Sequence, residues 1–246
     1  MRGRLFSLFA CLFALSFSLD SAYGANLAQQ RQYYDEAKRA LAKGDDGPYQ
    51  RYAAALQDYP LQPYLAYDEL TARLKSASNS EIEKFLAEHG DLPQISWMKL
   101  RWLRWLAERG EWNTFVKYYD PKLNFTELDC LNGQYQLSTG KRAEGFASAA
   151  KLWNVGKSQP AACDTLFAMW AAEGQLTEAR RWERAKLAAQ ARNYPLANNL
   201  VKTLTTLAPQ GQLLIDVAQN PELLNSPSRF MSAPSEMHKI LSTGPD

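Results

Sequence analysis

The sequence is poor in the residues that most catalytic and metal sites use. It has two histidines, His89 and His238, and three cysteines, and these do not have the spacing of a metal site. It contains no Gly-x-Ser-x-Gly element and no glycine-rich phosphate loop. We therefore expect no resident metal and no cofactor. His89 precedes Gly90 at a predicted helix end, where an imidazolium is mildly favoured, so we interpret it as a helix-terminal residue.

An excess of one charge is also lacking. The 246 residues contain 28 Lys and Arg against 26 Asp and Glu, a formal charge of +2 that falls to +1 without residues 1–24. Such a balance gives no electrostatic footprint for nucleic acid. Hydrophobic residues make up 46% of the chain, which indicates a packed core rather than disorder. No window shows the sustained alternation of a strand, so we expect an all-α protein.

The amino-terminal residues have the pattern of a secretory signal. Arg2 and Arg4 precede an apolar run from Leu5 to Leu19, and small residues allow cleavage after Gly24. The run is short for a bilayer span, which needs about 20 residues, although an uncleaved anchor is the alternative. Cys11 lies inside the apolar run, too early for a lipoprotein site. We expect residues 1–24 to be a cleaved signal peptide and the mature protein to be periplasmic, with no membrane span.

Helical periodicity and capping residues predict helix after helix. Asn26 is expected to cap the first, and Ser80 with Glu83 forms a predicted capping box. The predicted helices cover residues 26–43, 49–58, 65–74, 80–86, 93–106, 111–119, 127–137, 141–153, 160–172, 177–191, 194–204 and 212–217.

The stretch from Leu152 to Trp170 combines a helix end with a helix start. Gly156 is expected to end one helix with a positive φ, and Ser158 or Gln159 to cap the next. After that cap, one apolar stripe follows at helical spacing: Cys163, Leu166, Phe167 and Trp170.

A loose repeat runs through the chain. Similar helix ends recur at Gly44, Gly110, Gly140 and Gly174, and the last three are 30 and 34 residues apart. That period predicts a right-handed superhelix or solenoid of helical hairpins, similar to degenerate tetratricopeptide repeats. We assign this domain to residues 25–230. Several Ser and Pro residues break the periodicity beyond it, so residues 231–246 are expected to be a disordered or aberrant tail.

Two cysteines occupy nearly equivalent places in successive repeats. Cys130 lies ten residues before Gly140, and Cys163 lies eleven before Gly174. First helices of neighbouring repeats lie side by side, so the thiols can meet, and an exported protein favours a disulfide. We expect a Cys130–Cys163 disulfide, and two separate buried thiols are the alternative.

Tryptophans on consecutive predicted helices form another candidate site, because their rings can stack on sugars. Helical packing explains the same spacings, and we favour it because large aromatic residues are mostly buried. The candidate stacking residues are Trp97, Trp102, Trp105 and Trp112. Carboxylates give no better candidate. We interpret as surface charges Glu81, Glu83, Glu178 and Glu183.

Two blocks of the sequence carry a resemblance to a known family. Gly-Lys-Ser-Gln-Pro at 156–160, followed by Ala-Cys-Asp and Leu-Phe, resembles the amino-terminal superhelical part of the soluble lytic murein transglycosylases. The block Asp58–Leu65, with Tyr67, resembles the same family, and the likeness runs from about Leu27 to about Arg229. The resemblance implies a ring-shaped helical superhelix and also favours the cysteine pairing.

The resemblance also implies an activity that this chain lacks the motifs to perform. Members carry a lysozyme-like carboxyl-terminal domain that cleaves the β-1,4 bond between N-acetylmuramic acid and N-acetylglucosamine and gives 1,6-anhydro products. That domain's Glu-Ser, Gly-Leu-Met-Gln and Ala-Tyr-Asn-Ala-Gly motifs do not occur here, so no catalytic residue is assigned. We expect a scaffold domain truncated before the catalytic domain, inactive alone, whose full-length form meets peptidoglycan. The alternative is a stand-alone periplasmic binding scaffold for a protein or murein glycan.

Overall fold

The structure, a computed structural model, describes residues 9–225, with side chains from Asn26 onward. This part of the chain contains helices and no strand, as the periodicity predicted. The α-helices are α1 (Phe9–Lys43), α2 (Asp46–Ala54), α3 (Gln62–Ala72), α4 (Asn79–His89), α5 (Ile95–Glu108), α6 (Trp112–Tyr118), α7 (Thr126–Ser138), α8 (Arg142–Trp153), α9 (Ala162–Ala172), α10 (Glu178–Gln190), α11 (Tyr194–Val201) and α12 (Ala208–Gln219). Two short 3₁₀ helices are η1 (Pro121–Leu123) and η2 (Pro221–Asn225).

The repeated glycines end their helices as predicted. The φ angles are 73° at Gly44, 71° at Gly110, 80° at Gly140 and 70° at Gly174. After each one, the next residue's N–H donates to the carbonyl five residues earlier, as Lys141 does to Gln136. This pattern satisfies carbonyls that the helix end would otherwise leave unpaired, and glycine adopts it without steric cost.

One turn of the same kind has no glycine. At the end of α10, Arg192 has a φ of 57°, and Asn193 N–H donates to the carbonyl of Ala188. The sequence pattern missed this turn because its signal, a glycine, is absent there.

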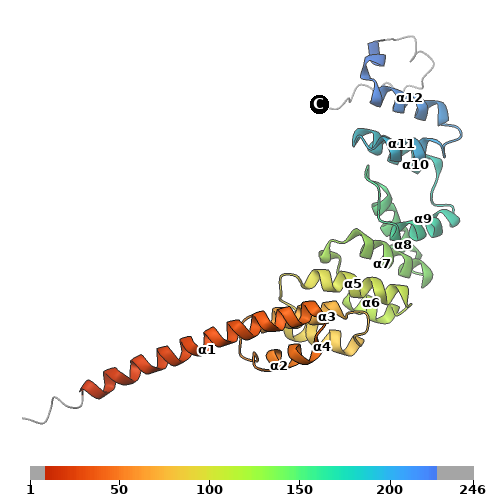
Figure 1. The fold of residues 1–246 in the computed structure, drawn as a ribbon. Helices are drawn as coiled ribbons and strands as arrows, with labels where there is room; N and C mark the ends of the chain where they lie inside the picture. Colours follow the sequence, from red (N-terminus) through yellow and green to blue (C-terminus); the bar gives the residue numbers. More distant parts are fainter. Residues whose placement is uncertain (1–8, 226–246) are drawn as a thin grey trace, which may run out of the picture. The chain divides into compact units, whose positions relative to one another are not determined.

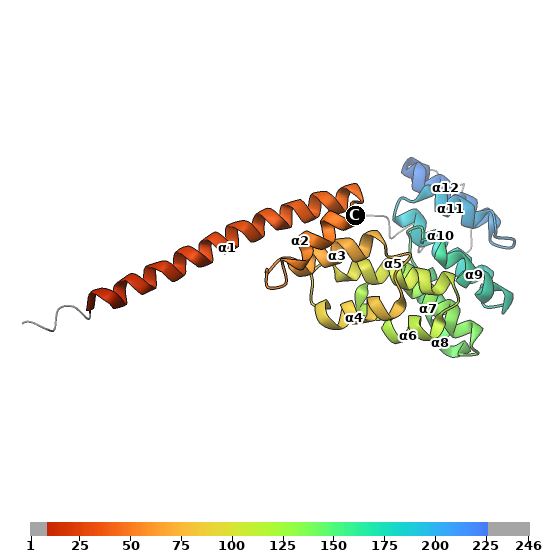
Figure 2. The same cartoon turned by 60° about the horizontal axis from the view of Figure 1, so that its bottom comes forward.

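The chain divides into two compact units, and the boundary between Met98 and Lys99 falls inside α5. In the first unit, α2 and α3 pack against α1 (Figures 1 and 2). Their buried centre consists of Ala37, Leu56, Tyr59 and Leu65. Tyrosine rings surround this small centre, so much of the packing at this end of the chain is aromatic.

The second unit has a larger core. Helix α7 packs against α8 and α9, while α10, α11 and α12 pack against one another (Figure 2). The core includes several fully buried residues: Cys130, Ala149, Cys163, Leu166, Trp170, Ala185, Ala188 and Ala197. Four of its small positions are alanines, which allow neighbouring helices to approach closely.

Two predicted caps were wrong. Asn26 lies inside α1 of the uncleaved chain, which begins at Phe9, so its predicted role as the first cap of the mature chain stays a prediction. Helix α4 is capped by Ser78, not Ser80, because the Ser78 hydroxyl accepts the N–H of Glu81 at 3.2 Å. Both serines have a glutamate three residues later, so spacing alone could not distinguish them.

The second wrong cap precedes α9. This helix begins after Ala161 without a side-chain cap, and Gln159 instead donates to the carbonyl of Leu152 at 2.6 Å. Gly156 does not have a positive φ. An added Cβ there would lie 2.2 Å from the carbonyl oxygen of Leu187 on α10, so glycine is required by close backbone contact.

The structure tests neither the predicted signal peptide at 1–24 nor the predicted tail at 231–246. The tail at 231–246 lies outside the described residues, as does His238, and side chains of the predicted signal peptide are not described. From Asn26 to Asn225, no helix combines the length and the apolar character needed to cross a bilayer.

Candidate functional site

The four predicted stacking tryptophans have different environments. Trp97 is 59% exposed, whereas Trp102 is fully buried and its ring lies 4.9 Å from that of Tyr118. A buried ring offers no face to a sugar, so Trp102 is a core residue. The interpretation that we favoured, packing between helices, holds for this residue.

The other two tryptophans are half-buried in the second unit. The guanidinium of Arg109 lies over the ring of Trp105, 5.1 Å from its centroid. Trp112 packs against Phe115 and Tyr135, with ring centroids 5.5 and 5.9 Å away. Both tryptophans therefore contribute to packing, and the four rings are not equivalent members of one stacking platform.

The predicted disulfide joins α7 to α9. Cys130 and Cys163 are fully buried, and their Cα atoms lie 4.9 Å apart. Close packing surrounds the bridge, because Gly133 on α7 lies where a Cβ would be 2.8 Å from the side chain of Leu166 on α9. Gln134 adds a hydrogen bond across the same pair of helices, donating to the carbonyl of Ala162 at 2.6 Å. The disulfide therefore fixes one layer of the helical array.

The next layer holds the connection between α8 and α9 against α10. Asn193 Nδ2 lies 3.4 Å from the carbonyl of Gly156, to which it donates, and also 3.4 Å from the Ser158 hydroxyl. The oxygen of the same side chain caps α11 by accepting the N–H of Leu196. Trp153 Nε1–H donates to the carbonyl of Arg180 at 3.1 Å. Through Asn193, the Gly-Lys-Ser-Gln-Pro block is therefore hydrogen-bonded to the start of α11.

A buried arginine completes this layer. Arg184 is only 4% exposed, and its guanidinium lies 4.3 Å from the Trp153 ring centroid and 5.5 Å from that of Phe167. Nη2 donates to the carbonyl of Lys157 at 3.3 Å. Burial lowers the pKa of the Arg184 guanidinium, and the nearby charge of Asp164 opposes that shift. The two rings compensate part of the cost of burying the charge.

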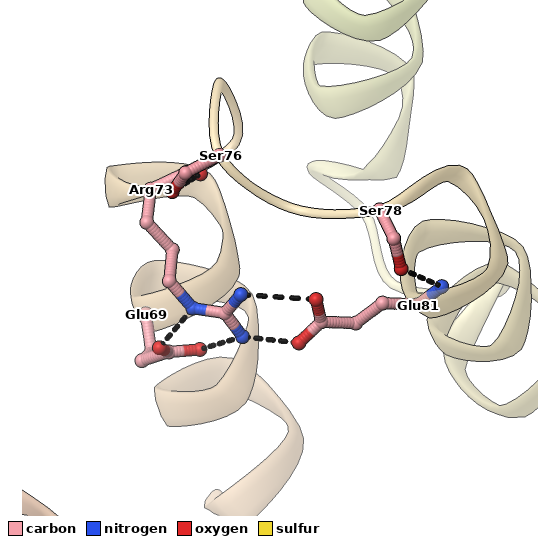
Figure 3. A network of polar contacts seen from close by, with 5 residues as sticks. All are labelled: Glu69, Arg73, Ser76, Ser78 and Glu81. Carbon is pink, nitrogen blue, oxygen red and sulfur yellow. Dashed lines mark hydrogen bonds and ion pairs between the residues drawn. The ribbon is translucent and has the colours of Figure 1, made fainter.

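The first unit is held by ionic contacts between α3 and α4. Figure 3 shows Arg73 between the carboxylates of Glu69 and Glu81, bound to both oxygens of each. The measured contacts include Nη1 to Glu81 Oε2 at 3.0 Å and Nη2 to Glu69 Oε2 at 3.1 Å. Hydrogen bonding to Arg73 lowers the pKa of Glu81. Glu81 is a surface carboxylate, as predicted, and it also joins two helices.

Another predicted surface carboxylate ties α10 to the loop before α12. Glu178 Oε1 accepts the backbone N–H groups of Thr205 and Leu207 at 2.6 and 3.0 Å. These two bonds lower the pKa of Glu178. Glu183 pairs with Lys186 at 2.8 Å within α10. A general acid in glycoside hydrolysis requires a raised pKa, so Glu81 and Glu178 have the opposite electrostatics.

The last candidates are metal-binding side chains and His89. Between Asn26 and Asn225, no group of three His, Cys, Asp or Glu side chains could hold a metal ion. His89 lies in the last turn of α4, with its ring centroid 5.0 Å from that of Phe85, as expected of a helix-terminal residue.

Comparison with known proteins gives the family context. No protein-family model matches the chain. The soluble lytic murein transglycosylase of Escherichia coli K12 is 30% identical over 234 residues, which cover 94% of this chain and 35% of the relative. The Salmonella typhimurium protein of the same name is 32% identical over 175 residues, covering 71% and 27%.

The solved structures that this chain resembles are also lytic transglycosylases. The lytic transglycosylase Slt of Pseudomonas aeruginosa, as an inactive mutant, is 64% identical, with a TM-score of 0.82 over 85% of this chain and 34% of that one. The 70-kDa soluble lytic transglycosylase in complex with bulgecin A is 28% identical, with a TM-score of 0.76 over 88% and 35%. The fold class predicted from the sequence, an all-α array of helical hairpins, is confirmed by these matches.

The chain is therefore related, over nearly its whole length, to the soluble lytic murein transglycosylases, and it spans about a third of the length of the relatives it matches.

Proposed function

We propose that this chain is the helical scaffold part of a periplasmic lytic transglycosylase that acts on peptidoglycan. The observation that carries the proposal is the match of 94% of the chain to 35% of a soluble lytic murein transglycosylase. In the proposed enzyme, the bond between N-acetylmuramic acid and N-acetylglucosamine is cleaved to a 1,6-anhydro product. The catalytic glutamate belongs to a lysozyme-like domain whose motifs are absent from this sequence.

The electrostatics of the described carboxylates support a scaffold role. Cleavage of a glycosidic bond needs a carboxyl group that is protonated near neutral pH and within reach of the leaving oxygen. Arg73 and backbone N–H groups favour the charged forms of Glu81 and Glu178. Their role is to hold helices together, and we expect the chain alone to release no anhydromuropeptides.

Export to the periplasm is part of the proposal. A disulfide between two buried cysteines is typical of proteins that fold in an oxidising compartment. The apolar run at Leu5–Leu19 has the length of a signal-peptide core. Amino-terminal sequencing of the protein purified from a periplasmic extract tests the predicted cleavage after Gly24, and a mature chain that begins at Met1 would contradict it.

A hybrid enzyme tests the scaffold role directly. Residues 26–225 replace the corresponding third of the Pseudomonas aeruginosa lytic transglycosylase, to which the chain is 64% identical. We expect the hybrid to release anhydromuropeptides from murein sacculi, while the present chain alone releases none above the buffer control. A folded hybrid without activity, or activity of the chain alone that is lost on mutation of one of its glutamates, would overturn the proposal.

The alternative function is a stand-alone binding scaffold for a protein or murein glycan. Both functions predict a folded helical array, and the hybrid separates them. A binding scaffold would bind sacculi or a partner but would not support turnover in place of the relative's own residues.

A further inference from the structure

The chain enters α9 through a run of backbone N–H groups that have no acceptor. We call residues 156–162 the α9 entry segment. Within the described residues, the N–H groups at 156–159, 161 and 162 make no hydrogen bond, and Pro160 has none to offer. The helix begins after Ala161 without a side-chain cap. Lys157, Ser158 and Ala161 are exposed, so a solute can reach these donors at the positive end of the helix dipole.

A buried cation lies against the same segment. Arg184 of α10 is 4% exposed, and its Nη2 donates to the carbonyl of Lys157 at 3.3 Å. The guanidinium also lies 5.5 Å from the ring centroid of Phe167, in the second turn of α9. Its positive charge is therefore next to both the entry segment and the start of the helix.

No acidic group pairs with this guanidinium. Arg184 Nε is fully enclosed and has no acceptor, and no ion pair joins Arg184 to a carboxylate in the described part of the chain. Nη1 is not enclosed in this way, so a ligand can reach it. Asp164, in the first turn of α9, acts on Arg184 only through its charge and is itself exposed. Because an unpaired buried charge is costly, the arrangement indicates a place for an anion from outside the chain.

The surrounding charges favour an anion as well. Lys157 is exposed and adds a second positive charge, so Lys157 and Arg184 outnumber Asp164 at the entry segment. From Lys141 to Leu204 the sequence contains ten Lys and Arg but only five Asp and Glu, although the whole chain is nearly balanced. This local excess raises the concentration of anions near the segment.

The arrangement of the donors selects the shape of the anion. A planar carboxylate pairs best with two parallel N–H groups of one guanidinium. Arg184 does not offer such a pair, because Nη2 donates to the carbonyl of Lys157 and Nε is enclosed. A tetrahedral oxyanion instead accepts hydrogen bonds from several separate backbone N–H groups at a helix start. The entry segment has that set of donors.

We propose that the α9 entry segment binds an oxyanion of the phosphate type. Its backbone N–H groups donate to the phosphate oxygens, while Lys157 and Arg184 supply the positive charge. The same contacts hold a free ion or a phosphate group esterified to a larger molecule. Binding at a partly exposed site of this size is weak, with a dissociation constant of about 1–10 mM. The proposal does not depend on the scaffold role.

Nuclear magnetic resonance of the ¹⁵N-labelled full chain tests the proposal, with inorganic phosphate as the probe and sodium chloride holding the ionic strength constant. We expect saturable shifts of the backbone amides of residues 156–162. Lys157→Gln weakens binding about threefold, since its charge is exposed. Arg184→Gln weakens it about tenfold, because a buried charge is screened less. The matched control is Lys122→Gln on η1, an exposed lysine outside the segment, which leaves binding unchanged. The amide spectrum verifies that each variant is folded, and Lys157→Gln carries the test if Arg184→Gln is not.

A second titration, with glycerol 3-phosphate, distinguishes the source of the group. A site for the free ion binds inorganic phosphate more tightly, and a site for an esterified phosphate binds glycerol 3-phosphate more tightly. Either order supports the proposal.

Three results would overturn it. One is the absence of saturable shifts in the entry segment up to about 50 mM phosphate. Another is equal affinity of Lys157→Gln and the unmodified chain. The third is acetate that binds the same amides as tightly as phosphate, which would reject a site built for a tetrahedral oxyanion.

Discussion

The two units share apolar packing and ionic contacts but differ in other respects. In the first unit, α1, α2 and α3 pack around a small buried centre with a rim of tyrosines, and Arg73 pairs with two glutamates. The second has a larger core with buried tryptophans and a disulfide. Ionic and phenolic contacts depend on water, salt and pH, whereas buried rings and a disulfide depend on them little. The comparison teaches that the disulfide and the buried tryptophan rings distinguish the second unit, while ionic contacts between helices occur in both units.

Removing the disulfide should have the largest effect on this comparison. Replacing Cys130 and Cys163 together by Ala deletes a cross-link between residues separated by 33 positions. The chain-entropy model predicts a loss of about 3.5 to 4 kcal/mol, and native disulfides typically contribute about 2–5 kcal/mol. Tryptophan fluorescence measures the second unit, which contains six of the seven tryptophans. Urea unfolding that is unchanged by the double substitution would show that the bridge does not stabilise this unit.

Gly156→Ala is expected to have the next largest effect. The added methyl group would lie 2.2 Å from the Leu187 carbonyl oxygen and 2.8 Å from its carbon, so backbone atoms must move. Overpacking of this kind costs about 1–3 kcal/mol. The matched control is Gly47→Ala on α2, where no atom lies within 4 Å of the added Cβ. That change should have a small effect, because Gly47 lies in the first turn of α2 and directly precedes Pro48, which disfavours a helical conformation of a residue with a Cβ. Equal effects of the two substitutions on thermal unfolding would contradict the close contact.

Two serines near the start of α4 test which residue caps this helix. Ser78→Ala removes the cap of α4 and should cost about 1 kcal/mol. Ser80→Ala changes the residue that the sequence pattern predicted as the cap, and its effect should be close to zero. Urea unfolding followed by circular dichroism gives both values. A larger loss for Ser80 would mean that the helix begins where the pattern placed it.

The sequence predicted features that depend on neighbouring residues along the chain. The helices, the four glycine turns and the Cys130–Cys163 pairing follow from periodicity and spacing, and the structure agrees with them. The features it could not predict depend on contacts between distant segments. Gly156 resembles a helix end in sequence, but its role comes from α10, more than 30 residues away. Glu81 and Arg73 gave no pairing signal, because nothing local identifies the partner of a surface charge.

The same limit applies to the candidate sites. Spacing made Trp102 and Trp97 equivalent as sugar-stacking residues, yet burial separates them completely.

The smallest expected effect concerns the pH dependence of the first unit. Because Arg73 lowers the folded-state pKa of Glu81, this pair stabilises the fold at pH values above the ordinary glutamate pKa, and the contribution is lost as the pH falls through the lowered value. The side chains of Arg73 and Glu81 are 40% and 42% exposed, so solvent screening limits the contribution to about 0.5–1 kcal/mol. Arg73→Gln should therefore reduce the free energy of unfolding by that amount at neutral pH and have little effect in acid. Arg39→Gln is the matched control, because the Arg39 side chain is 64% exposed and its pair with Glu36 lies within one helix. If Arg73→Gln destabilised the protein equally at both pH values, the arginine would act through the packing of its apolar stem and not through its charge.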